Sequence, residues 1–214
     1  MNDNELMNIW KSHDQKLEKI LVLNKTLVYD VTKAKVGQIL GGMRGVKKVF
    51  LIMAIPYTAL LYLLTFLGFQ ANAFFVTFGF GSIGFIMSAM IIGYIYHLQL
   101  INSVDRVYDV VTVQKKIADL KISSFNMVRL SIVQIPFWSI CWISLEALKT
   151  SPILYGGINL IVLIVLIYLT HWLYNNLDPK NPKSKVAKVF LSGAEWEPIE
   201  KASAILDQLK DLKE

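Results

Sequence analysis

The stretch AFFVTFGFGSIGFIMSAMIIGYIYH, residues 73–97, decides the fold class of this chain. It offers about 20 mostly apolar residues in a row, the length that a helix needs to cross a hydrocarbon core of about 30 Å. Lipid supplies no hydrogen-bonding partners, so a spanning segment must satisfy its own backbone, as a helix does. The stretch therefore predicts a membrane-spanning helix.

Three further apolar blocks of similar length flank this one, at residues 48–69, 127–148 and 152–177. They raise the hydrophobic content of the 214 residues to 54%, above the roughly 45–50% of ordinary soluble domains. We therefore expect an all-α integral membrane protein with four transmembrane helices and cytoplasmic, coiled-coil-like helical extensions. The expected division is a cytoplasmic amphipathic helix with a glycine hinge at 1–47, a transmembrane hairpin at 48–96, a cytoplasmic helical extension at 97–124, a second transmembrane hairpin at 125–176, and a cytoplasmic linker with an amphipathic helix at 177–214.

Lysine and arginine residues gather on one side of these spans. They precede residue 49, lie between residues 106 and 121, and follow residue 179, whereas the connections near 70–72 and 148–151 contain only Lys149. Such residues settle on the cytoplasmic side of a membrane. The sequence thus predicts a multi-pass protein of the cell inner membrane with both termini in the cytoplasm. The formal net charge of +6 reads as this topology signal and not as a nucleic-acid surface, because basic residues alternate with acidic ones.

The sharpest chemical motif in the chain is GFGSIG at residues 79–84, a literal match to the dinucleotide-binding pattern. That pattern needs a strand before it and a helix N-terminus facing a phosphate, whereas these glycines lie within an apolar span. Small residues four apart, such as Gly84 with Ser88 and Ala89 with Gly93, instead favour close packing of a neighbouring helix in lipid. Cys141 is the sole cysteine, so no cysteine cage can form. We expect no catalytic residue, no cofactor and no metal site.

Ionisable residues near the ends of the spans raise the alternative of a transport pathway, because charge within a bilayer is costly and often functional. His97 and His171 fall near the cytoplasmic ends of their spans beside aromatic residues, and Glu146 falls near an outer end. These depths favour anchoring at the membrane interface. We therefore expect none of the three to belong to a proton or ion pathway.

The polar segment before the first span has the period of a coiled coil. Apolar residues recur at two seam positions of a heptad over residues 6–31, with charged residues on the far side. Asn24 is a polar seam residue, of the kind that selects a register at some cost in stability. We name as the N-terminal seam the residues expected to make contacts: Trp10, Leu17, Ile20, Asn24, Leu27 and Val31.

A surface against which this seam can pack is expected in the same chain. The residues after His97 keep a helical period, so the second span should run on as one helix through 97–121, about 37 Å at 1.5 Å per residue. Its apolar stripe includes Val104, Val107 and Val111. The N-terminal seam would pack against this stripe, or against the same helix of a second subunit.

Two further features complete the expected cytoplasmic bundle. Three glycines between the N-terminal helix and the first span should act as a hinge that lets the helix fold back; they are Gly41, Gly42 and Gly45. A last amphipathic helix should begin near EWEPIEK, residues 195–201, where acidic residues favour a helix start. This helix is the candidate third member of the bundle.

Three stretches carry a family resemblance: ELMNIWKSHDQKLEKILVLNKTLV at 5–28, VTVQKKIADLKISS at 111–124 and VRLSIVQIPFW at 128–138. Together they resemble a group of small, uncharacterised bacterial inner-membrane proteins with four spanning helices, described beside extracytoplasmic-function sigma factors. The resemblance implies a membrane-anchored regulator of a cytoplasmic partner. The sequence departs from zinc-type anti-sigma domains, because His13 has no cysteines near it.

These patterns predict a protein that is not an enzyme. The expected function is to anchor or regulate a cytoplasmic protein through the helical extensions, with sigma-factor-linked signalling as the implied setting. The expected partners are the lipid bilayer, a cytoplasmic protein and a second copy of the chain, with no nucleic acid. The alternative function is a small transporter or channel subunit.

Overall fold

The computed structural model describes residues 3–104, 110–177 and 196–211, and every regular element within them is a helix. The predicted all-α class is therefore confirmed. In chain order the elements are α1 (Asp3–Gln70), α2 (Phe74–Val104), α3 (Val110–Val133), α4 (Ile135–Ile140), α5 (Leu145–Thr150), the π-helical segment η1 (Pro152–Gly156), α6 (Gly157–Asn176) and α8 (Glu197–Asp211).

Three helical segments are long and apolar enough to cross a membrane. They lie in α1, in α2, and in η1 with α6. The remaining apolar block, 127–148, is instead divided among α3, α4 and α5. Pro136 explains the break between α3 and α4, because proline lacks a backbone N–H and its ring clashes with the carbonyl four residues earlier. Of the four predicted spans, three are thus confirmed as helices that could span a bilayer.

The turn between α1 and α2 is as short as expected and has a defined cap. Asn72 adopts a left-handed conformation with φ of 54°, which asparagine tolerates better than most residues. Its N–H donates to the carbonyl of Phe69, and the N–H of Ala73 donates to that of Gly68. This pair of bonds is a Schellman motif, which satisfies the last carbonyls of a helix and reverses the chain.

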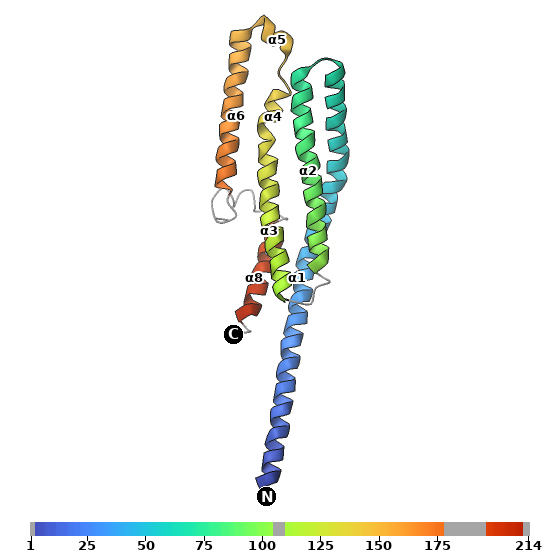
Figure 1. Cartoon of the computed structure of the whole chain (residues 1–214), viewed down its shortest axis with the longest axis vertical. Helices are drawn as coiled ribbons and strands as arrows, with labels where there is room; N and C mark the ends of the chain where they lie inside the picture. The colour runs from blue at the N-terminus through green and yellow to red at the C-terminus, as the bar shows by residue number, and fades with distance from the viewer. Residues whose placement is uncertain (1–2, 105–109, 178–195, 212–214) are drawn as a thin grey trace.

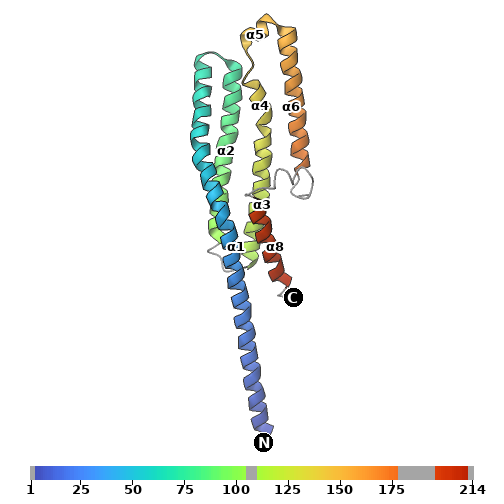
Figure 2. The ribbon, with the colours of Figure 1, turned by 180° about the vertical axis from the view of Figure 1, so that it is seen from behind.

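The helices form a flat row with a protruding rod (Figure 1). α1 and α2 are an antiparallel pair at one edge, α6 lies at the other edge, and α3 with α4 forms a column between them. Figure 2 shows the same order from behind, with α8 beside the base of this column. The α1–α2 turn and α5 lie at one end of the row, and both termini lie toward the opposite end.

Two apolar cores hold the row together. The upper core joins α1, α2 and Cys141, with Leu61 and Ile83 at its centre. The lower core joins α1, α2, α3 and α8, and includes Leu40, Ile101 and Ile199, all fully buried. Since each buried side chain of this size contributes roughly 1.5–3 kcal/mol, the lower core fixes the base of the bundle.

Small residues of α2 bring its neighbours close, as the sequence predicted. A Cβ added at Gly84 would lie 3.3 Å from the ring of Tyr62 on α1, and one at Gly93 would lie 2.3 Å from the sulfur of Met127 on α3. The Tyr62 hydroxyl also lies 2.9 Å from the Oγ of Ser88. The prediction that α2 is the closely packed helix is confirmed, and the motif at 79–84 lies within a helix.

Two predictions about the base of the bundle are wrong. α1 runs unbroken through Gly41, Gly42 and Gly45. Each glycine costs a helix about 1 kcal/mol, and the burial of Leu40 and Met43 in the same turns offsets this cost. The expected single helix over 97–121 is also interrupted: α2 ends at Val104, and α3 begins at Val110 and runs back along α2. Residues 105–109 between them lie outside the described part of the chain.

Candidate functional site

The N-terminal seam lies on a part of α1 that extends beyond the other helices (Figure 1). Its five apolar members are 55–70% exposed, with Ile20 the least and Trp10 the most exposed, and Asn24 is exposed as well. The prediction that the seam packs against the extension of α2 is therefore wrong. The reason is the missing hinge, because a straight α1 carries the seam past the end of α2.

The valines expected to receive the seam do not form one surface. Val104 is buried in the lower core, whereas Val111 is 67% exposed at the start of α3. Val107 lies outside the described residues. The structure thus leaves the interaction residues of α1 apart from those of the α2 extension.

The base of the bundle is completed by α8, as the sequence anticipated. The Trp196 ring meets that of Phe125 edge to face, with centroids 4.7 Å apart. Gln114 donates from Nε2 to the carbonyl of Leu206 at 3.2 Å. On the outer face, the ammonium of Lys201 holds the pKa of the Glu197 carboxyl below its usual value through a hydrogen bond. α8 therefore covers the junction of α1 and α3 with its apolar face and presents charges to solvent.

The most unusual chemistry lies where the two cores meet. Lys47 of α1 is fully buried and His97 of α2 is 1% exposed. The Nζ of Lys47 lies 3.0 Å from Nδ1 of His97, and Nε2 of His97 lies 2.7 Å from Oγ of Ser123 on α3. We name these three residues the polar junction. They link three helices through side chains alone.

Aromatic rings enclose the polar junction from the side of the upper core. The Nζ of Lys47 lies 4.5 Å from the centroid of the Tyr94 ring, a distance at which the face of the ring attracts a cation. The ring of Phe50 stacks on the ring of Tyr94, with the two centroids 4.1 Å apart. These contacts lower the cost of burying the lysine, which would be several kcal/mol for an isolated charge.

The charge of Lys47 decides which atoms of the polar junction donate and which accept. A lysine ammonium can only donate, so Nδ1 of His97 must accept when Lys47 is charged. In a neutral imidazole the other nitrogen then carries the proton, and Nε2 donates to Ser123. With Lys47 charged, the hydrogen bonds of the polar junction therefore run in one direction, from the ammonium through the imidazole to the Ser123 hydroxyl.

The sequence reading of His97 as an interfacial anchor is wrong, because its ring is buried among the helices and bonded to Lys47 and Ser123. Local sequence patterns do not indicate the burial of Lys47, because it stands among the basic residues that flank the first span. A signal was present: Lys47 and His97 lie at nearly equal distances from the turn at Asn72. An antiparallel hairpin pairs such positions, so the two should have been considered together.

The other ionisable candidates are exposed. Glu146 lies on the surface of α5, and His171 on α6 accepts or donates a hydrogen bond at 3.0 Å with Asn175 on its own helix. Neither contacts the polar junction in the described structure. The expectation that they stand outside a pathway stays a prediction.

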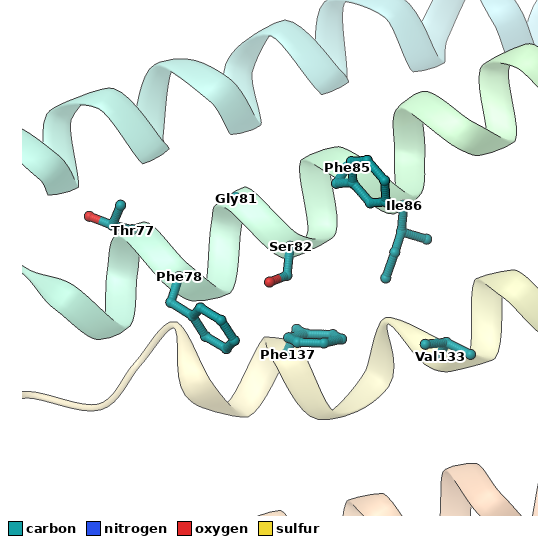
Figure 3. A pocket seen from close by; sticks show the side chains of 8 residues that line it. All are labelled: Thr77, Phe78, Gly81, Ser82, Phe85, Ile86, Val133 and Phe137. Carbon is teal, nitrogen blue, oxygen red and sulfur yellow. The ribbon is translucent and has the colours of Figure 1, made fainter.

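An open groove lies between α2 and the α3–α4 column (Figure 3). Phe78 and Ile86 of α2 point toward Phe137 and Val133 across it, and Phe85 also lines it. Its polar groups are the hydroxyls of Thr77 and Ser82, and the Thr77 hydroxyl donates to the carbonyl of Ala73 in its own helix. The groove is therefore a mostly apolar surface feature, and its lining holds no ionisable side chain.

Among the residues that the structure describes, no three His, Cys, Asp or Glu side chains lie together as metal ligands would. Comparison of the chain with known protein families, curated proteins and solved structures gave no match. The residues of the chain itself therefore carry the functional argument.

Proposed function

We propose that this chain is a non-enzymatic membrane protein that anchors or regulates a cytoplasmic protein through its helical extensions. The observation that carries the proposal is the exposed N-terminal seam on a helix that continues unbroken from a spanning segment. Burial of each Leu or Ile is worth roughly 1.5–3 kcal/mol, so a row of exposed ones is a strong docking surface. Sigma-factor-linked signalling is the setting that the sequence resemblance implies.

The proposal includes a membrane arrangement. We propose that the α3–α4 column crosses the bilayer as a fourth span, which puts the two termini on the same side. The basic residues support an inner-membrane location with that side in the cytoplasm. The position of α8 beside the base of α1 agrees with this arrangement.

Labelling of single cysteines in intact cells tests the arrangement. In a Cys141→Ala background, an impermeant reagent should label a cysteine at Ala71 and spare one at Asn24 or Lys210. The reverse pattern would overturn the orientation. Labelling of cysteines at both Ala71 and Lys210, which lie toward opposite ends of the row, would show that the α3–α4 column does not cross the membrane.

Site-specific photo-crosslinking in living cells tests the function. A crosslinker at Leu17 should give an adduct with a cytoplasmic protein, whereas one at Glu18 on the far face of α1 should not. The adduct should disappear when Leu27→Asp is added, and mass spectrometry of the adduct would show whether a sigma factor is present. An equal yield at both positions, or no adduct beyond the chain itself, contradicts the proposal.

The polar junction supports a second candidate, a small transporter or channel subunit. Ionisable groups buried between helices near a membrane often mark ion or proton pathways, and Lys47, His97 and Ser123 form a directed chain. Proton flux into vesicles that hold the purified protein would decide between the candidates. Flux that His97→Gln abolishes while the protein stays folded would favour transport over the anchoring function.

A further inference from the structure

The outward face of α1 extends far beyond the N-terminal seam. At 3.6 residues per turn, steps of three and four residues lead from Leu17 through Val31, Gly42 and Val49 to Leu67, and every one of these positions is exposed. The buried residues of α1, such as Leu40 and Lys47, lie on the opposite side of the helix. We name this continuous face the outer stripe.

The position of α1 leaves the outer stripe accessible along its whole length. Figures 1 and 2 show the N-terminal part of α1 extending alone beyond the bundle and its last part at the edge of the row. Where α1 crosses α2 at the base, the stripe positions Gly42 and Val49 are exposed as well. A neighbour could therefore approach the aqueous and membrane parts of the stripe together. Lipid can cover the upper part, but no lipid covers the part that extends from the base.

We infer that the outer stripe is the surface on which two copies of this chain pair, side by side and parallel. Two copies inserted in one membrane have the same orientation, so their stripes meet in register without any rearrangement. Such an isologous contact uses the same patch on both subunits. The inference rests on the proposed function in one respect, because the second copy would occupy the same seam that the proposed function assigns to a cytoplasmic protein.

Charge placement agrees with a parallel pair. With Trp10, Leu17, Asn24 and Val31 at one seam position, Asp30 and Lys35 occupy flanking positions five residues apart, which face each other across a parallel coiled coil. Both are exposed, and symmetry makes the contact twice. Asn24 would meet its own copy, the arrangement in which a buried amide fixes register.

The exposed area is of the size that a dimer needs. The five apolar seam residues and the flanking Leu21, Leu23 and Val28 are each 43–70% exposed. Burying one such side chain is worth roughly 1.5–3 kcal/mol at about 25 cal/mol per Å², which corresponds to roughly 60–120 Å² of buried surface for each. Their sum is of the same order as the roughly 800 Å² per partner that a stable interface buries.

The glycines that do not form a hinge would lie at the contact between the two paired helices. A Cβ added at Gly42 or Gly45 would meet nothing within 4 Å in the chain, and no glycine among the described residues has a positive φ. Neither turn nor packing within the chain therefore needs them. Small residues at such a place let two helix backbones approach closely.

Disulfide crosslinking of the full chain in native membranes tests the inference. In a Cys141→Ala background, Ile20→Cys on the outer stripe should form a dimer, and Val22→Cys, an exposed apolar position on the opposite side, should not. Adding Leu17→Asp and Leu27→Asp should lower the dimer yield at Ile20→Cys tenfold or more, about the factor that one lost buried leucine implies. Equal yields at positions 20 and 22, or none at either, would overturn the pairing.

A glycine variant separates pairing from folding. Gly45→Leu should reduce the dimer yield at Ile20→Cys while the protein accumulates normally, whereas Gly93→Leu should disturb the fold through its contact with Met127. An unchanged yield in Gly45→Leu would remove the glycines from the interface and contradict the continuous stripe.

The outcomes distinguish this inference from the proposed function. A dimer at position 20 with no cytoplasmic adduct at Leu17 supports pairing and contradicts the anchoring function. A cytoplasmic adduct with no dimer contradicts pairing and supports the function.

Discussion

The two halves of α1 show opposite relations between residue type and burial. In the lower half Trp10 is 70% exposed, whereas in the upper half Lys47 is completely buried. Hydrophobicity alone would reverse this order. The difference arises because α2, α3 and α8 reach only as far as the middle of α1, and their chemistry decides what is buried there. The lower half carries a row of exposed apolar side chains, whereas the upper half packs around a buried charge.

The largest expected effect comes from the buried lysine. Lys47→Ala should lower the free energy of unfolding by about 3 kcal/mol or more, because it leaves a cavity and removes the donor to Nδ1 of His97. Lys48→Ala, at the exposed neighbouring position, should leave it nearly unchanged. Unfolding of the purified protein in micelles, followed by circular dichroism, measures both.

A double variant sharpens this test. Replacement of both partners of a buried hydrogen bond by well-packed apolar residues is often nearly neutral or stabilising, so Lys47→Met with His97→Phe should recover part of the loss. Equal losses in Lys47→Ala and Lys48→Ala would contradict the buried position of Lys47.

The next effect concerns α8 at the boundary between the two halves. Ile199 is fully buried, and Ile199→Ala should cost about 2–3 kcal/mol. The loss should appear as local release of α8, because helix ends can open separately from the rest of a protein. Hydrogen exchange of residues 197–206 measures it, with Glu200→Ala on the exposed face as the control. Unchanged protection from hydrogen exchange in Ile199→Ala would show that Ile199 does not hold α8 against the base of the bundle.

A smaller effect is expected from the hydrogen bond within the α1–α2 pair. Tyr62→Phe removes the contact with Ser88, and such bonds between membrane helices average about 0.6 kcal/mol. A double-mutant cycle with Ser88→Ala isolates this energy in the same unfolding assay. A coupling energy near zero would show that shape alone joins the two helices there.

The smallest effect on the fold should come from the seam. Leu17→Asp should change the unfolding of a single micelle-bound chain by no more than about 0.5 kcal/mol, as exposed substitutions usually do. Gel filtration with light scattering selects the monomeric fraction for this measurement. A loss as large as that of Ile199→Ala would mean that the seam packs within its own chain.

The apolar blocks carried most of the fold that was predictable. Segments such as 48–69 and 152–177 had to become helices, because their length and composition leave no other way to satisfy the backbone in lipid. The start of α8 near Trp196 was also readable from its acidic first turn. The interruption of the block at 127–148 was harder to predict from the sequence, since a proline within a membrane helix can either kink the helix or end it.

The candidate site was less predictable than the fold. The heptad over residues 6–31 identified the seam residues but not their exposure, because period specifies a face and not its neighbour. Lys47 and His97 each had an ordinary explanation at the end of a span. Only their distances from the turn at Asn72 linked them.

The sequence by itself determined that this chain is helical, with segments long and apolar enough to cross a membrane, and it marked the side of α1 that carries the seam. The straight course of α1 through its glycines and the return of α3 along α2 were decided by tertiary structure. The same holds for the enclosure of Lys47 between two cores. Local composition sets which segments become helices, since that requirement is met one helix at a time. Burial depends on which helices end beside one another, and that depends on contacts between residues distant in the chain.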